Sequence, residues 1–361
     1  MAIIDQLPKQ FQVENIGHSL EGRALNLIKI GTGPTKVFLW SQMHGDEATG
    51  TMALMDLLNF LQLDDQQEQS LEILERCSLY MLPMVNPDGA ERFTRRNAQQ
   101  LDINRDFLKC QSIEAQCLKQ VQESIKPHFG FNLHDQSNLW SVKGNGNPAA
   151  LSFLAPAFDD ACSINDNRKQ AMQVIADIFQ ELKVHLPSQI GLFDDTFEPR
   201  AFGDNFQATG MATILIEGGS MIGDEESQQV RKMVFAAILK GLSSIASESF
   251  LSREIKDYAS IPKNNKSIFH LLIHNISLSG IKTSIGINYK PWPAKDGTSI
   301  NKFYTIEDIG DLSTLQAYEV YDANNHEVKG EITFDTPANF DLIQKQEIIL
   351  SFKKGILQSK R

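Results

Sequence analysis

Cysteine is scarce in this chain of 361 residues and shows no pattern. There are four cysteines, and no two of them form a C-x-x-C pair. This irregular spacing favours free, packed thiols in a reducing compartment over a disulfide framework.

Long apolar runs and positive charge are also in short supply. No apolar stretch is long enough to span a bilayer, and residues 1–6 lack the basic and apolar regions of a signal peptide. We therefore expect a cytoplasmic protein. The balance of 34 Lys+Arg against 45 Asp+Glu argues against nucleic acid or an anionic membrane as a partner. With 42% hydrophobic residues, the chain is long and apolar enough for two folded domains.

A pair of hard metal ligands follows an apolar run early in the chain. Val37–Trp40 reads as a buried strand, and His44 and Glu47 come just after it. If the backbone bends sharply, which Gly45 permits, the imidazole and the carboxylate can face one cation. A His and a Glu at this spacing also occur by chance, so the pair requires a third ligand elsewhere.

A second histidine closes another apolar run. His134 ends Phe129–Leu133 and precedes a polar loop, which is the position of a ligand at a strand end. Taken alone, it would be read as a structural histidine. The other histidines lack a comparable carboxylate neighbour.

The segment between these ligands is rich in arginine. Asn86-Pro-Asp-Gly89 is typical of a tight turn with a positive φ at the glycine. The arginines that follow are Arg92, Arg95, Arg96 and Arg105. In an acidic chain they indicate an anion site, because the planar guanidinium suits a carboxylate or an oxyanion; the alternative is solvated surface charge.

An acid lies at the end of a later β-branched run. Thr213–Ile216 predicts a central strand, and Glu217 with two following glycines would then lie at the rim of the sheet. An acid at a strand end can also be a surface residue whose only effect is to increase solubility. A metal-activated water needs a nearby base, and Glu217 is the best candidate in the chain.

These elements, in this order, resemble the zinc carboxypeptidases of the carboxypeptidase A family. The resemblance covers roughly the first 250 residues and rests on His44-x-x-Glu47, Asn86-Pro-Asp-Gly89, Thr94-Arg95-x-Asn97-Ala98, Asp102-x-Asn104-Arg105, His134 and Glu217. It implies a mixed eight-stranded sheet and one zinc ion bound by His44, Glu47 and His134.

The resemblance also implies roles for the remaining positions. Glu217 would be the general base and then the general acid. Arg95 would polarise the scissile carbonyl, and Arg96 is the alternative candidate for this role. Asn104 and Arg105 would hold the free carboxylate of the substrate. Asp102 would accept a hydrogen bond from a zinc-ligating histidine.

Two departures from the family pattern concern specificity. The digestive members carry a mobile tyrosine before the catalytic acid, whereas residues 81–257 contain no tyrosine. Asp106 stands where many members have asparagine, and if it faced the site it would favour a leaving residue with an amine, such as a diamino acid of a cell-wall peptide. The charged and aromatic segment 194–205 is either a solvated loop or a pocket wall in which Arg200 adds an anion contact.

Residues 1–252 are predicted to form the catalytic domain, an α/β fold with a mixed, mostly parallel sheet flanked by helices. The expected strands are 24–30, 36–42, 77–82, 129–134 and 213–217, and the expected helices are 48–63, 113–125, 168–184 and 226–246. Ligands at strand ends place the site at the carboxyl edge of the sheet.

Residues 253–361 are predicted to form a small all-β accessory domain after a linker at 261–266. The expected strands are 268–276, 283–289, 317–321, 330–334 and 348–352, which suggests a small sandwich or barrel.

Three functions follow from these features. The first is a zinc metallocarboxypeptidase, including those that trim cell-wall peptides. The second is a metal-dependent deacylase of N-acyl amino acids, since succinylglutamate desuccinylase and aspartoacylase share the His, Glu and Asp-x-Asn-Arg set. The third is an inactive relative that only binds peptide. The Asn-Pro-Asp-Gly and Thr-Arg-x-Asn-Ala motifs favour the peptidase, and in either enzyme the substrate is a peptide or an N-acyl amino acid with a free carboxylate.

Overall fold

The computed structural model describes residues 3–62, 68–142, 146–295 and 299–360. These divide into two compact units, one made of residues 1–138 and 142–265 and the other of residues 139–141 and 266–361. The first unit continues past residue 252, the predicted boundary, because the short helix α8 (Ile255–Ala259) packs on α5 (Asp166–Leu182). Within the described residues, no helix has the length and apolarity that a membrane crossing requires.

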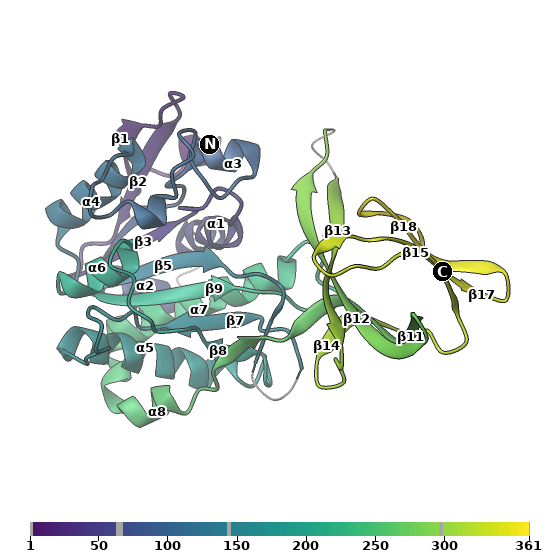
Figure 1. The fold of residues 1–361 in the computed structure, drawn as a ribbon. Helices are drawn as coiled ribbons and strands as arrows, with labels where there is room; N and C mark the ends of the chain where they lie inside the picture. The colour runs from purple at the N-terminus through teal and green to yellow at the C-terminus, as the bar shows by residue number, and fades with distance from the viewer. Residues whose placement is uncertain (1–2, 63–67, 143–145, 296–298, 361) are drawn as a thin grey trace. The chain divides into compact units, whose positions relative to one another are not determined.

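The first unit is built on one sheet with the strand order β1-β2-β4-β3-β5-β9-β7-β8 (Figure 1). Its strands are β1 (Gln12–His18), β2 (Ala24–Ile30), β3 (Thr35–Ser41), β4 (Cys77–Leu82), β5 (Phe129–Asp135), β7 (Leu151–Leu154), β8 (Ile190–Leu192) and β9 (Ala212–Gly218). The central strands β4, β3, β5 and β9 are mutually parallel, whereas β1, β2 and β7 introduce antiparallel pairs. The predicted mixed, mostly parallel sheet is confirmed.

Helices cover both faces of this sheet. They are α1 (Thr49–Gln62), α2 (Glu68–Arg76), α3 (Pro87–Arg92), α4 (Ile113–Ile125), α5, α6 (Phe202–Ala208), α7 (Gln228–Ser247) and α8, with short 3-10 turns η1 (Ile4–Gln6), η2 (Ile103–Arg105) and η3 (Ser249–Ser252). Val37 and Leu39 of β3 pack in the core that contains α1, α5 and α7, whereas Phe38 and Trp40 pack in the core that contains α4 and α6. Burial on both faces explains the uninterrupted apolar run of this strand.

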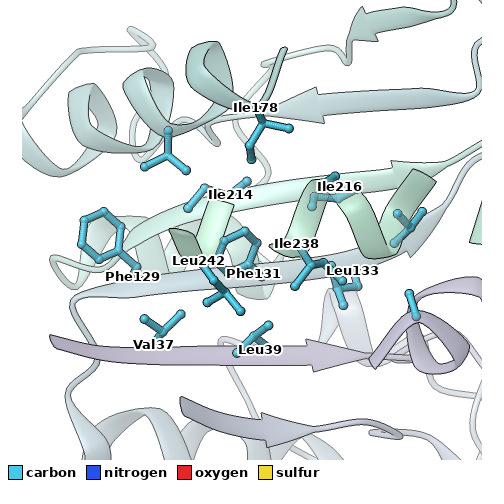
Figure 2. Packing of buried hydrophobic residues seen from close by; sticks show 14 of the residues in the cluster. Val37, Leu39, Phe129, Phe131, Leu133, Ile178, Ile214, Ile216, Ile238 and Leu242 are labelled. Atoms are coloured by element: carbon cyan, nitrogen blue, oxygen red, sulfur yellow. The ribbon is translucent and has the colours of Figure 1, made fainter. Parts of the chain in front are cut away.

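Figure 2 shows the larger core, where labelled side chains of β3, β5 and β9 meet those of α5 and α7. Phe131 lies at its centre with no solvent exposure. It also explains Gly241 of α7, since a Cβ there would lie 2.8 Å from the Phe131 ring. The core therefore holds β5, and with it His134, against the helices that cover this face.

The second unit is all-β, as predicted. One sheet has the order β14-β11-β12-β13-β16 and the other β15-β17-β18-β19. The strands are β11 (Ile268–Leu278), β12 (Ile281–Pro293), β13 (Ile300–Gly310), β14 (Gln316–Asp322), β15 (Glu327–Glu331), β16 (Thr336–Pro337), β17 (Asn339–Gln344), β18 (Glu347–Lys353) and β19 (Ile356–Lys360). Both sheets contribute to one apolar core, which contains Ile285 and Phe352. Instead of a plain linker at 261–266, the segment Asn264–Lys266 forms the short strand β10.

Replacing Phe131 with Ala tests the central core. Because this ring is fully buried, its loss should lower the free energy of unfolding of the first unit by about 3–5 kcal/mol. Val184→Ala, at a side chain that is 70% exposed in the same unit, should change it by less than about 0.5 kcal/mol. Urea titration followed by circular dichroism measures both, and equal effects would show that Phe131 is not a core residue.

Candidate metal and active site

The structure brings the three predicted ligands together. His44 and Glu47 lie in the turn after β3, and His134 lies near the end of the adjacent strand β5. One ligand atom from each residue lies within 4.8 Å of the other two. Both histidines are buried and the Glu47 side chain is 12% exposed. The three residues could therefore hold a metal ion at the carboxyl edge of the sheet.

The turn that carries His44 and Glu47 is shaped differently from the prediction. Gln42, not Gly45, takes the left-handed conformation, with a φ of 52°. The Gln42 side chain donates a hydrogen bond to the carbonyl of Gly45 and accepts one from the Thr51 hydroxyl. Gly45 is required for another reason, because a Cβ there would lie 2.0 Å from the backbone of Gly89. Buried polar contacts thus hold the bend.

The Asn86-Pro-Asp-Gly segment opens a helix, so the predicted tight turn is wrong. The Asn86 side chain accepts a hydrogen bond from the Gly89 N–H and caps α3, with Pro87 at its first position. A proline suits this place because its missing N–H has no partner inside the helix. Asn86 also donates to the carbonyl of Met43, which ties this helix start to the ligand turn.

Asp102 and Arg95 surround His44. Asp102 Oδ1 lies 3.2 Å from His44 Nε2, and Asp102 Oδ2 accepts a hydrogen bond from Arg95 Nε at 3.0 Å. Arg95 Nη1 lies 3.1 Å from His44 Nδ1 and 3.4 Å from Glu47 Oε1. A carboxylate on Nε2 fixes the tautomer that leaves Nδ1 free to bind a metal. Asp102 and Arg95 therefore lie where their predicted roles require, and those roles stay predictions.

The donor atoms fit a cation. Glu47 Oε1 lies 2.7 Å from His44 Nδ1, and Glu47 Oε2 lies 2.7 Å from His134 Nδ1. The Arg95 guanidinium only donates hydrogen bonds, so its contact with His44 Nδ1 makes that nitrogen an acceptor. The nitrogen therefore faces the Glu47 carboxylate, which is also an acceptor. Two imidazole nitrogens and a carboxylate whose lone pairs converge form a donor set that zinc accepts.

Charge couples these groups. Burial raises the pKa of Glu47, but the adjacent His44 and His134 outweigh burial and hold that pKa well below its usual range. For His44, burial lowers the pKa, but Glu47 and Asp102 outweigh it and raise the pKa above 6.5. Burial lowers the pKa of His134. Because a ligating imidazole must be unprotonated, a raised pKa of His44 means that protons would compete with a metal ion for this residue as the pH falls.

Glu217 lies beside this cluster. It pairs in register with His134 on the adjacent parallel strands β5 and β9, so both side chains lie on the same face of the sheet. Burial, followed by the negative charges of Glu47 and Asp135, raises its pKa well above 4.5. No hydrogen bond to its carboxylate occurs within the described residues. Glu217 therefore lies beside the ligand cluster, and its role as a base stays a prediction.

Asp135 is an acid of the site that sequence reasoning missed. Its backbone N–H donates to Glu47 Oε2 at 3.2 Å, and its Oδ2 accepts from the Thr49 N–H at the start of α1. Burial, followed by the charge of Glu47, raises its pKa to about 7. Its position directly after His134 at a strand end was the available signal.

The remaining predicted substrate contacts have partners within the protein. The Asn104 side-chain oxygen accepts a hydrogen bond from the Phe202 N–H, and Arg96 donates to the carbonyl of Gln100. Arg105 and Arg200 both contact the carboxylate of Glu198. Arg96 thus bonds within its own loop, whereas Arg95 contacts the metal-ligand cluster.

Asp106 does not face the site, although the predicted preference for a leaving residue with an amine required that it should. Its side chain is 6% exposed, and its carboxylate accepts hydrogen bonds from the backbone of Gln111 and from the backbone and hydroxyl of Ser112. Ser112 in turn caps α4. The acid supports a helix start, and it provides no argument for a diamino-acid substrate.

Sequence comparison matches the N-terminal part of the chain. The family model of the zinc carboxypeptidases matches residues 2–143. Carboxypeptidase 2 of Trichophyton rubrum is 31% identical over 100 residues, which cover 28% of this chain and 18% of that protein. Carboxypeptidase SOL1 of Arabidopsis thaliana is 35% identical over 101 residues, which cover 26% of this chain and 20% of that protein. The predicted family resemblance is confirmed, and the match spans about a fifth of the length of these relatives.

Solved structures share the fold. A metallo-carboxypeptidase from Burkholderia cenocepacia has a TM-score of 0.55 at 17% identity and covers 69% of this chain and 68% of its own. A metallo-carboxypeptidase from Pseudomonas aeruginosa, solved in complex with (2-guanidinoethylmercapto)succinic acid, has a TM-score of 0.54 at 18% identity and covers 68% of both chains. At these identities the likeness concerns the fold.

Replacing His134 with Ala tests the metal site. The unaltered protein should hold about one zinc ion per chain. The purified variant should lose it, because His44 and Glu47 alone do not complete the three-ligand site. His185→Ala, which removes an exposed histidine, should keep it. Elemental analysis after dialysis measures both proteins. Full zinc content in His134→Ala would show that the ion binds elsewhere.

Proposed function

Because residues 2–143 match the zinc carboxypeptidase family, we propose that this chain is a zinc-dependent metallocarboxypeptidase that releases the C-terminal residue of a peptide. The observation that carries the proposal is the convergence of His44, Glu47 and His134 next to Glu217 at one edge of the sheet. A zinc ion bound there would supply a Lewis acid and a water of lowered pKa.

Glu217 is the proton carrier in this proposal. Its position on β9, in register with His134, puts its carboxylate next to the place where a water and a scissile carbonyl would meet. Glu217 takes a proton from the attacking water and returns it to the nitrogen of the leaving amine. Burial and the negative charges of Glu47 and Asp135 raise the pKa of Glu217, which favours the protonated form that must return a proton to the leaving amine.

Arg95 supplies positive charge to the carbonyl oxygen. Asp102 accepts a hydrogen bond from the guanidinium Nε, and the Arg95 side chain is 43% exposed. A preorganised cation stabilises the negative charge that develops on the oxygen during attack. Asp102 holds both Arg95 and His44 and thereby links the two functions.

Asn104 and Arg105 are the proposed anchors for the free carboxylate of the substrate. They belong to the turn η2, which follows Asp102 directly. Asn104 uses its side-chain oxygen to accept from Phe202, so its amide N–H groups are the donors that a substrate would meet. A guanidinium beside an amide suits a carboxylate.

Support for a peptidase, as opposed to a deacylase of N-acyl amino acids, comes from the sequence comparisons. The relatives matched are carboxypeptidases, and the family model matches residues 2–143, which include the Asn-Pro-Asp-Gly and Thr-Arg-x-Asn-Ala motifs. An inactive peptide-binding protein would not need Glu217 and Arg95 beside the ligand cluster, and both are present.

Glu217→Gln should abolish turnover and keep the metal. Loss of the proton carrier should lower kcat by about 10²–10⁴-fold, because general acid–base catalysis contributes about that much. Zinc content should stay unchanged, since Glu217 is not among the three ligands. Glu225→Gln, an exposed acid on the following loop, is the control and should keep both. Peptide hydrolysis at the unaltered rate in Glu217→Gln would remove its assigned role.

Arg105→Ala should affect only substrates with a free C-terminus. Loss of a charge-assisted contact should raise KM for free-acid peptides by about 10- to 100-fold, and the same peptides with an amidated C-terminus should change little. Arg76→Ala, at an exposed position at the end of α2, is the control. Equal changes for free and amidated peptides would contradict a carboxylate-binding role.

A further inference from the structure

An internal carboxylate lies on the arginines proposed to bind the substrate. Glu198 Oε2 lies 3.1 Å from Arg105 Nε and 2.7 Å from Arg200 Nη2, and Glu198 Oε1 accepts from Arg200 Nε at 2.9 Å. The Glu198 side chain is 26% exposed. The two arginines thus share one counter-ion.

The two arginines hold Glu198 unequally. Arg200 binds it with both Nε and Nη2 and also with its backbone N–H. Arg105 contacts it through Nε alone and uses Nη1 for the carbonyl of Asn104, while its Nη2 makes no hydrogen bond within the described residues. Arg105 can therefore accept a further anion, which would lie close to the Glu198 carboxylate.

This ion cluster is fixed beside the candidate active site. The turn after Asp102 and the segment that carries Glu198 and Arg200 are joined by two hydrogen bonds, from the Phe202 N–H to Asn104 Oδ1 and from the Phe107 N–H to the Arg200 carbonyl. Asp102 itself contacts His44. The pKa of Arg200 is raised mainly by the Glu198 carboxylate and to a smaller extent by the charge of Asp102. Glu198 is thus held next to Asn104 and Arg105, the proposed anchors for the substrate carboxylate.

We propose that Glu198 is a specificity-determining residue, an internal anion that selects the charge of the leaving residue. The proposal rests on the proposed function. A C-terminal carboxylate bound to Arg105 would bring the side chain of the leaving residue near Glu198. An ammonium group on that side chain is attracted to Glu198, and a carboxylate there is repelled. The enzyme therefore prefers a basic or neutral C-terminal residue over an acidic one.

The experiment compares peptides that differ only in a C-terminal Lys, Leu or Glu. Glu198→Gln should lower kcat/KM for the Lys peptide and raise it for the Glu peptide, each by about two- to five-fold, which is the range of a partly exposed charge pair. The Leu peptide gives the reference. The ratio of Lys to Glu cleavage should therefore fall by about 4- to 25-fold.

Glu21→Gln is the matched control. Glu21 also bridges two arginines, Arg23 and Arg92, and its side chain is 32% exposed, but it lies between β1 and β2 and has no contact with the metal cluster. It should keep the ratio of the unaltered enzyme. Glu198→Asp, which keeps the charge, should also retain a preference for Lys.

Two outcomes would overturn the proposal. One is an unchanged Lys-to-Glu ratio in Glu198→Gln, and the other is the same fall in Glu21→Gln. Should Glu198→Gln be too unstable to assay, loss of the Lys preference in Glu198→Asp would count equally against it. Absence of cleavage by the unaltered zinc-loaded protein would refute the proposed function instead, and calorimetric binding of N-acetyl-lysine against N-acetyl-glutamate would then still test the charge selection.

Discussion

The parallel alignment of three strand ends is the constraint on which the site depends. β3, β5 and β9 are neighbours in the sheet and run in the same direction, so their carboxyl ends lie along one edge. Each end then delivers one part of the site: the ligand turn, His134 and Glu217. A shift of one residue in the register of β9 would turn Glu217 to the opposite face. The apolar core that fixes this register therefore supports the chemistry as directly as it supports the fold.

Burial at that edge makes the charges interdependent. Glu47 stays ionised because two imidazoles adjoin it, whereas Glu217 and Asp135 have raised pKa values because burial and the charge of Glu47 act together. Neighbouring acids with opposite pKa shifts can have different roles. An ionised acid such as Glu47 suits a cation, and an acid of raised pKa such as Glu217 suits proton transfer. Arg95 and Asp102 add a further ion pair at the margin. A structural ion pair does not need a further acid such as Glu217, which lies beside the pairs without joining one. The arrangement is therefore typical of a functional site.

Sequence patterns predicted the central part of the fold well. The apolar runs of β3, β4, β5 and β9 have a clear signal, since strands buried on both faces are largely apolar. Strand β2 has a different signal, because its apolar residues are interrupted by Asn26 and Lys29. The short strands β7 and β8 and the half-exposed edge strand β1 were missed, because few residues and mixed polarity leave no period to detect. The ligands were predicted because His44, Glu47 and His134 follow or end apolar runs and occur in the order found in a known family.

The errors concern partners that only the tertiary structure shows. Asp106 was considered as a specificity residue, but it supports the start of α4. Asn86-Pro-Asp-Gly has the composition of a turn, and its role as a helix start follows from contacts with the ligand turn. Glu198 was not singled out because nothing in its local sequence shows that Arg105 comes near it. Charge pairing between distant segments is set by the fold, and a single sequence does not encode it locally.

The most direct test of the account is anomalous diffraction from crystals grown with zinc, recorded on both sides of the zinc absorption edge. The account predicts one strong peak at about 2.0–2.2 Å from Nδ1 of His44, Nδ1 of His134 and a carboxylate oxygen of Glu47. A peak at another position, or none between these three residues, would contradict it.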